Sequence, residues 1–417
     1  MKGIVLRLAN PRLRRAAWIG AAVFLGISFY RAVWRSHNDF TGFHIHMGES
    51  FRSGVLFEDH YMVFRAMVNG GFSLLGGHLA AALSVLVAFV GLGVTIVLWN
   101  RMAAQRRPLP PAATYVASVV ALLICASYVF RDLDDTGLQI VPLAMMTVGV
   151  HALVRGKALA AGGWFGTAAA YRVTPLLILP FLLYKRQWRA AAWMIVFLVG
   201  LNFLPALVHG WDWTVQKNGA FLRRLAAVAT AEDPADTTFD EQNVRNQSLQ
   251  FAIARYLQTY PPGDARYLDR PGFVQFGNLD NKTTGLVVKA VFAALALVLA
   301  WRFRRPYAAD PEGPDPAPEF ATVVLLAALL SPVCALDHLT FAFPALLLTT
   351  RAFFDSPPRR WRTAVFVSMT AIMLLSHRAV LGDLRLVVRS YKEHTLAALL
   401  LLLLVLTIPP RDPAAAA

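Results

Sequence analysis

The chain has 417 residues, of which 57% are hydrophobic and 16% charged, with a formal net charge of +15 and a mean hydropathy of +0.49. Soluble domains have about 25% charged residues, so this composition excludes an ordinary soluble domain. Lipid-exposed backbone must satisfy its own hydrogen bonds, and the long apolar runs are unlike barrel strands, so we expect an all-α polytopic transmembrane bundle. The basic residues stand in short clusters at the ends of apolar runs, which indicates topology and not nucleic-acid binding.

In chain order, the apolar runs predict about ten full spans in a single membrane domain, 1–417. The first, from Ala16 to Trp34, is longer than a signal-peptide core and lacks a small-x-small cleavage site, so we expect it to remain uncleaved. The other spans are expected near 76–99, 112–130, 138–154, 188–208, 284–301, 319–335, 338–354, 363–377 and 395–409.

The stretch 158–184 differs from these spans. It is about one span long, yet basic residues flank both ends, Pro175 and Pro180 interrupt it, and Arg172 lies in its middle. Because both flanks favour the same side of the membrane, we interpret it as a re-entrant pair of half-helices with Arg172 at the turn. A buried arginine there suits a lipid phosphate, whereas the alternative is a snorkelling side chain or a structural salt bridge.

The charge distribution predicts the orientation. Arg-rich segments, including the linker 302–318, are expected inside, and the first loop (35–75, with interfacial helices) and the large loop (209–283) outside. The unusual polar groups then gather at the outer face, where we expect the outer loops to cap an active site. We expect an integral protein of a bacterial inner membrane whose site faces away from the cytoplasm.

Two acidic groups lie beside predicted spans. Asp39 directly follows the first span, where a carboxylate can act as a general base towards a sugar hydroxyl; the alternative is a solvated carboxylate or a helix N-cap. Asp132, Asp134 and Asp135 form a short acidic loop. This loop suits a divalent cation or sugar hydroxyls, or is a plain polar turn.

Two further motifs combine neutral and ionisable polar groups. Arg245 precedes Asn246-Gln247-Ser248-Leu249, whose amides and hydroxyl can bind sugar hydroxyls or cap a helix. Asp337-His338 follows the break at Ser331-Pro332, so it is either a functional pair or a helix N-cap with an interfacial histidine. The histidines lack the spacing of a zinc site, and no metal is proposed from them.

These segments together resemble the GT-C-type membrane glycosyltransferases of family 87, the polyprenol-phosphate-mannose-dependent α-mannosyltransferase-like group, over residues 16 to 405. Asn246-Gln247-Ser248-Leu249 matches the family's Asn-Gln-Ser-Leu tetrapeptide as it stands. The other similar segments are Asp39-Phe40 with Gly54-Val55-Leu56-Phe57, Tyr171-Arg172-Val173-Thr174-Pro175-Leu176 leading to Trp188-Arg189, and Ser331-Pro332 through His338 to Phe343-Pro344.

The chain also departs from the family pattern. Arg172 stands where the family has lysine, and Asp337 replaces the first histidine of its His-His pair. The family's Tyr-x-Tyr-x-Pro-Pro stretch is not evident around Tyr61 to Phe72.

The resemblance implies a glycosyltransferase that moves a sugar, with mannose expected, from a polyprenyl-phosphate donor to a lipid- or glycan-linked hydroxyl, with inversion. It implies Asp39 as general base, and donor-phosphate contacts from Arg172, His338 and Arg245. The substrate-binding candidates are Asn246, Gln247, Ser248 and Asp337.

We expect membrane lipid around the protein and no nucleotide sugar, nucleic acid or cofactor, with a divalent cation left open. The competing hypotheses are a transporter or flippase of lipid-linked glycans, for which inverted repeats would be expected, and a non-catalytic assembly protein of the cell envelope.

Overall fold

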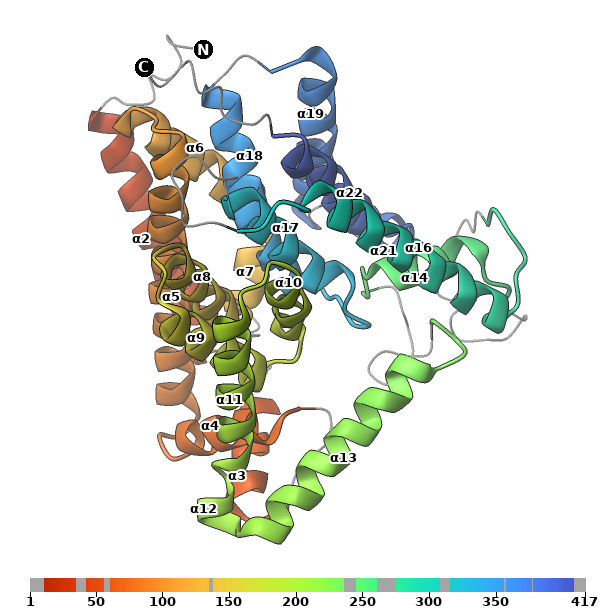
Figure 1. Ribbon diagram of the computed structural model, residues 1–417. Coiled ribbons are helices and arrows are strands. Elements are labelled where there is room, and N and C mark those ends of the chain that lie inside the picture. The colour runs from red at the N-terminus through yellow and green to blue at the C-terminus, as the bar shows by residue number, and fades with distance from the viewer. Residues whose placement is uncertain are drawn as a thin grey trace.

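The computed structural model describes residues 11–34, 43–55, 61–134, 138–235, 245–260, 275–307, 316–355, 358–376 and 378–408. In these ranges the chain is helical, and its only β-type pairing is an isolated bridge between Gln258 and Leu279 (Figure 1). The predicted all-α class is therefore confirmed.

The first half of the chain contains α2 (Pro11–Trp34), α3 (Ile45–Arg52), α4 (Val63–Ser73), α5 (Gly77–Arg106), α6 (Pro111–Ile124), α7 (Ala126–Asp134), α8 (Ile140–Val154), α9 (Ala158–Tyr171), the 3₁₀ helix η2 (Thr174–Leu177), α10 (Ile178–Tyr184), α11 (Trp188–Phe203) and α12 (Ala206–His209). The second half contains α13 (Trp211–Thr230), α14 (Leu249–Leu257), α16 (Asn281–Arg302), α17 (Pro316–Leu329), the 3₁₀ helix η3 (Asp337–Ala342), α18 (Phe343–Asp355), α19 (Arg360–Leu375), α20 (Arg378–Leu381), α21 (Leu384–Ser390) and α22 (Glu393–Leu406).

Three described helices are long and apolar enough to cross a membrane: Gly77–Gln105, Trp188–His209 and Asn281–Arg302. A fourth span is possible if Pro111–Ile124 and Ala126–Asp134, which meet at 62°, count as one. The predicted number of about ten full spans is not confirmed. Several apolar runs form helices of only 14 or 15 residues, such as α8 and α17. Such helices rise about 21–23 Å, less than the ~30 Å hydrocarbon core.

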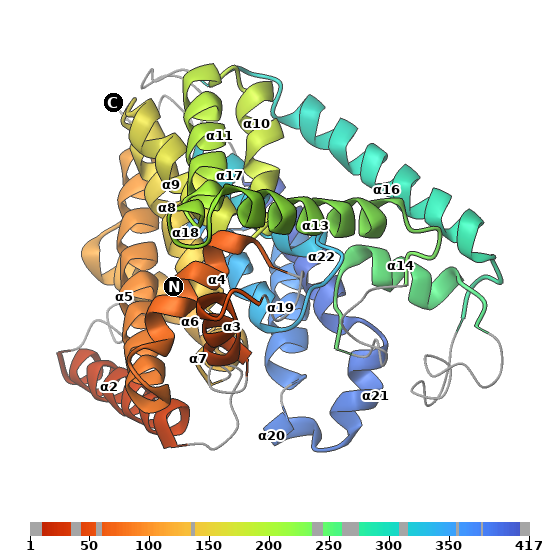
Figure 2. The ribbon, with the colours of Figure 1, turned by 90° about the horizontal axis from the view of Figure 1, so that it is seen from below.

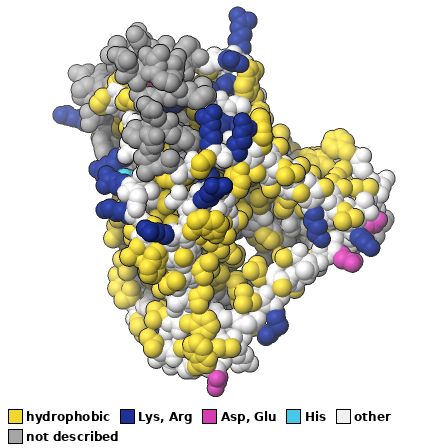
Figure 3. All heavy atoms as spheres, in the orientation of Figure 1, with side chains coloured by type: hydrophobic (Ala, Val, Ile, Leu, Met, Phe, Trp, Pro, Cys, Tyr) yellow, Lys and Arg dark blue, Asp and Glu magenta, His cyan; other side chains and the backbone are white. Residues whose placement is uncertain are grey.

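The surface fits a membrane protein. Figure 3 shows hydrophobic side chains over much of the visible face, with lysine and arginine grouped mainly in the upper half of that view. Large apolar side chains such as Leu207 and Trp301 are exposed, at 83% and 67%. By contrast, nearly every residue of α17 is buried, so that helix forms the centre of the bundle.

Close packing of α9 against α11 fixes the position of Arg172 at the end of α9. A Cβ atom on Gly162 or Gly166 would lie 2.4 Å from the Ala190 carbonyl oxygen or 2.5 Å from that of Met194. Two glycines four residues apart thus let the two backbones approach, as in membrane helix pairs. The segment 158–184 contains two helical pieces, α9 and η2–α10, separated at Arg172. Its re-entrant path stays a prediction.

The described parts of the two loops predicted to lie outside are also helical. Residues 35–75 contribute α3 and α4, which pack on each other, and 209–283 contributes α13 and α14. In Figures 1 and 2, α13 extends away from α12 as a long strut towards the region of α14.

Candidate active site

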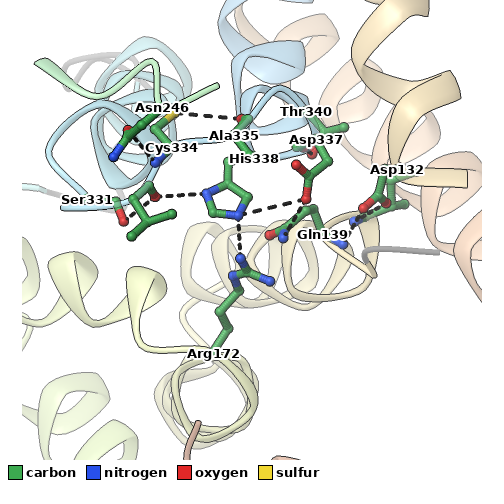
Figure 4. A network of polar contacts seen from close by, with 12 residues as sticks. Asp132, Gln139, Arg172, Asn246, Ser331, Cys334, Ala335, Asp337, His338 and Thr340 are labelled. Atoms are coloured by element: carbon green, nitrogen blue, oxygen red, sulfur yellow. Dashed lines mark hydrogen bonds and ion pairs between the residues drawn. The ribbon is translucent and has the colours of Figure 1, made fainter. Parts of the chain in front are cut away.

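The structure brings Arg172 and His338 together, although they are 166 positions apart. Arg172 follows α9 with an extended backbone, and His338 is the second residue of η3. The Arg172 Nη2 atom contacts Nε2 of the His338 ring (Figure 4). Two residues predicted to bind the donor phosphate are therefore neighbours.

The hydrogen bonds of His338 define its tautomer. Its Nδ1 lies 2.9 Å from the Val333 carbonyl oxygen, which can only accept, so Nδ1 carries a hydrogen. The guanidinium of Arg172 can only donate, so Nε2 accepts from it. His338 is accordingly a neutral imidazole that orients Arg172, and the charge in this contact belongs to Arg172.

Asp337 lies beside the same ring nitrogen of His338 that Arg172 contacts, outside the candidate membrane spans (Figure 4). Its Oδ2 is 3.7 Å from His338 Nε2 and accepts a hydrogen bond of 3.0 Å from Gln139 Nε2. Burial acts to raise the pKa of the Asp337 carboxyl, but the neighbouring His338, the charge of Arg172 and the Gln139 hydrogen bond together hold that pKa below its ordinary value. Asp337 therefore remains a carboxylate and partly balances the charge of Arg172.

The acidic loop at the end of α7 has structural partners. The Asp132 carboxylate accepts from the backbone N–H groups of Gln139 at 2.8 Å and Ile140 at 3.0 Å, at the N-terminus of α8. Asp134 forms an ion pair of 2.7 Å with Arg31 of α2. Asp135 lies outside the described residues, and the described part of the chain holds no cluster of three or more potential His, Cys, Asp or Glu metal ligands.

Asn246 holds the segment that precedes His338. Its Nδ2 donates to the Pro332 carbonyl at 2.9 Å, and its Oδ1 accepts from the backbone N–H groups of Cys334 and Ser248, both at 3.0 Å. The Asn246 side chain therefore fixes the backbone on both sides of Val333, whose carbonyl orients His338.

Gln247 and Ser248 complete this connection. The backbone N–H of Gln247 donates to the Cys334 carbonyl at 2.6 Å, and its side-chain Nε2 donates to the Arg389 carbonyl at 3.1 Å. Ser248 caps α14 by accepting from Phe251 N at 3.3 Å. We call residues 246–248 the amide clamp. All three are buried, and the substrate contacts predicted for them remain a prediction, while Asn246 and Gln247 directly hold residues 332–334.

The remaining predicted residues are not joined to this network by the described contacts. Arg245 is exposed and lies within electrostatic range of Arg389. Asp39, the predicted general base, lies outside the described residues.

Arg65 of α4 was not among the residues predicted from the sequence. This arginine is only 1% exposed, and its guanidinium carbon lies 4.3 Å from the ring centroid of Tyr61 and 5.2 Å from that of Tyr171. The signal in the sequence was a single cation within the apolar run Met62 to Val68. Without a motif around it, that signal did not stand out.

The half-buried contact between Arg172 and His338 thus lies beside a break between helices. The comparisons give the class directly: the profile of glycosyltransferase family 87 matches residues 60–332, about two thirds of the chain. The chain belongs to glycosyltransferase family 87, and it is a glycosyltransferase. No curated protein and no solved structure matches it. Nothing in these comparisons favours the transporter hypothesis.

Proposed function

We propose that this glycosyltransferase takes its sugar, mannose by resemblance, from a polyprenyl-phosphate donor and transfers it to a lipid- or glycan-linked hydroxyl. The observation that carries the proposal is the contact between Arg172 and His338. A guanidinium oriented by a neutral imidazole presents its remaining N–H donors as a planar fork, the geometry that suits a phosphate group.

The chemistry requires one base and one stabilised leaving group. Asp39 accepts the proton of the acceptor hydroxyl, whose oxygen attacks the anomeric carbon from the face opposite the phosphate. The bond between the anomeric carbon and the phosphate oxygen breaks, and its electron pair remains on that oxygen. The configuration at the anomeric carbon is therefore inverted. Positive charge placed in advance around the phosphate lowers the barrier, so a general acid is not required.

The other predicted contacts fit the same scheme at the outer face of a bacterial inner membrane. Asp337 limits the excess positive charge around Arg172 in the empty site. The amide clamp supports residues 332–334, which precede His338. The side chains of the clamp are proposed to order the site around the sugar. Arg245, being exposed, is proposed to meet the donor or acceptor headgroup at the rim of the site.

Transfer should be measured with purified protein, a synthetic polyprenyl-phosphate mannose and a panel of hydroxyl acceptors. We expect Asp39→Asn to lower kcat by about 10²–10⁴-fold, because a positioned general base contributes that much. Equal rates for wild type and Asp39→Asn would reject Asp39 as the base and leave the enzyme class intact. If no polyprenyl-phosphate sugar is used, the donor class is wrong. Movement of labelled lipid across vesicles without transfer would favour a transporter.

A further inference from the structure

Arg65 is a buried cation whose hydrogen-bonding capacity is largely unused. Within the described ranges, its Nη2 alone has a hydrogen-bond contact, with the ring nitrogens of His44 at 3.4 and 3.5 Å. Its Nε and Nη1 have no hydrogen-bond partner among the described residues, although the side chain is 1% exposed. Buried charged groups are normally paired, because desolvating a charge without compensation costs several kcal/mol.

The surroundings of Arg65 supply no anion within the described ranges. Tyr61 and Tyr171 provide ring faces, and His44 provides a ring nitrogen. Arg172 has the carboxylate of Asp337 close by, whereas no ion pair of Arg65 is found among the described residues. An arginine that packs on two aromatic rings and meets no carboxylate in the described part of the chain indicates a site prepared for an external anion.

Arg65 and Arg172 belong to one site. Tyr171, on which Arg65 packs, is the residue directly before Arg172, and the charge of Arg65 adds to burial in lowering the pKa of Arg172. His44 experiences the charge of both arginines. Thus α4 of the first outer loop and the end of α9 direct two positive charges into the same region.

We propose that Arg65 and Arg172 bind the donor phosphate together as a two-arginine clamp, with Arg65 as a phosphate-binding residue. This inference rests on the proposed polyprenyl-phosphate donor. The donor's phosphodiester carries one negative charge. When the bond to the anomeric carbon breaks, the electron pair left on the phosphate oxygen turns the leaving group into a phosphomonoester with a second negative charge. Arg172 orients the phosphate before reaction, and Arg65 stabilises the charge that develops during it.

The clamp makes a prediction about binding that does not depend on turnover. We expect a polyprenyl monophosphate to bind wild-type protein more tightly than the uncharged polyprenol of the same length. Arg65→Gln should weaken monophosphate binding by about 10- to 100-fold, the range for losing hydrogen bonds to a charged group. Arg65→Gln should leave the binding of polyprenol unchanged. Arg65→Lys should bind the monophosphate more tightly than Arg65→Gln but less tightly than wild type, because lysine keeps the positive charge and lacks the planar fork of N–H donors.

Arg351→Gln is the matched control. Arg351 is also a buried arginine, 3% exposed, but it donates to Asn100 Oδ1 at 2.8 Å and to the Arg107 carbonyl at 3.0 Å, apart from the site. Its replacement should leave monophosphate affinity unchanged, which separates the loss of a ligand contact from the general loss of a buried arginine. Thermal unfolding of each variant establishes that it is folded before binding is compared.

The outcomes distinguish the two proposals. If wild type and polyprenyl monophosphate do not associate, the donor class is wrong. If wild type binds it and Arg172→Gln weakens binding, while folded Arg65→Gln binds as wild type does, the two-arginine clamp is wrong and the donor class stands. In the transfer assay, the clamp further requires Arg65→Gln to lower kcat more than it raises KM for the donor, because Arg65 acts mainly on the developing charge.

Discussion

Arg65 shows, at the scale of one residue, that a binding site can be recognised because it lowers the stability of the ligand-free protein. Two nitrogens of its buried guanidinium have no hydrogen-bond partner among the described residues, and such an arrangement destabilises a protein until an anion binds. We therefore predict that Arg65→Met raises the free energy of unfolding of the ligand-free protein by about 1–2 kcal/mol, since apolar replacement of buried charge is often stabilising. Thermal unfolding in detergent measures this.

Arg351→Met provides the contrast, because it would leave Asn100 and the Arg107 carbonyl without their donor and should destabilise by about 1–3 kcal/mol. A clear loss of stability in Arg65→Met would contradict the interpretation, since it would mean that Arg65 supports the fold.

His338 allows the tautomer to be tested by amide substitutions. A glutamine can bring its carbonyl oxygen near the position of Nε2 and accept from Arg172, whereas an asparagine can replace only the Nδ1 contact with the Val333 carbonyl. We expect His338→Gln to retain at least 10-fold more donor affinity than His338→Asn, corresponding to a hydrogen bond with a charged donor of about 1.5–3 kcal/mol. Binding of polyprenyl monophosphate measures the difference, and the reverse order would reject the assigned tautomer.

At the scale of elements, the amide clamp links α14 and the loop before η3. We predict that Asn246→Ala destabilises the protein by about 1–3 kcal/mol, because it leaves the Pro332 carbonyl and the Cys334 N–H unsatisfied. We also expect kcat to fall, because the backbone that orients His338 loses its support. Ser248→Ala removes one helix cap and should cost about 0.5–2 kcal/mol with a smaller change in kcat. Unfolding measurements and steady-state kinetics check both variants. If Asn246→Ala raised only KM, with unchanged stability, Asn246 would instead contact substrate directly.

The same elements explain what could be predicted from the sequence. Arg172, His338 and the amide clamp stood out because each interrupts an apolar or helical pattern, and such interruptions can be read directly from the sequence. The contacts between them depend on how α9, α14 and η3 pack, which local pattern does not specify. Arg65 was missed because α4 has the composition of an ordinary amphipathic helix, and its partner Tyr171 is more than a hundred residues away.

For the whole molecule, composition correctly predicted the all-helical class, whereas the number of spans predicted from the apolar runs is not confirmed. The run 112–130 bends where α6 meets α7, and the run 319–335 ends as α17 at Leu329, before Ser331-Pro332. Hydropathy averages over such breaks because the residues on both sides remain apolar. The break after Leu329 leads to η3, which carries His338, so a feature that shortens a predicted span also forms the candidate site.

Orientation is the remaining property of the whole molecule, and the fold offers a direct way to test it. Both native cysteines, Cys125 and Cys334, are fully buried, so we expect wild-type protein to react little with an impermeant thiol reagent. Arg245→Cys and Arg304→Cys introduce thiols at exposed positions in the proposed outer and inner segments. In intact cells we expect the first to be labelled at once and the second only after permeabilisation, because the basic segments remain inside. The opposite pattern would place the Arg172–His338 site on the cytoplasmic side and reject a donor presented at the outer face.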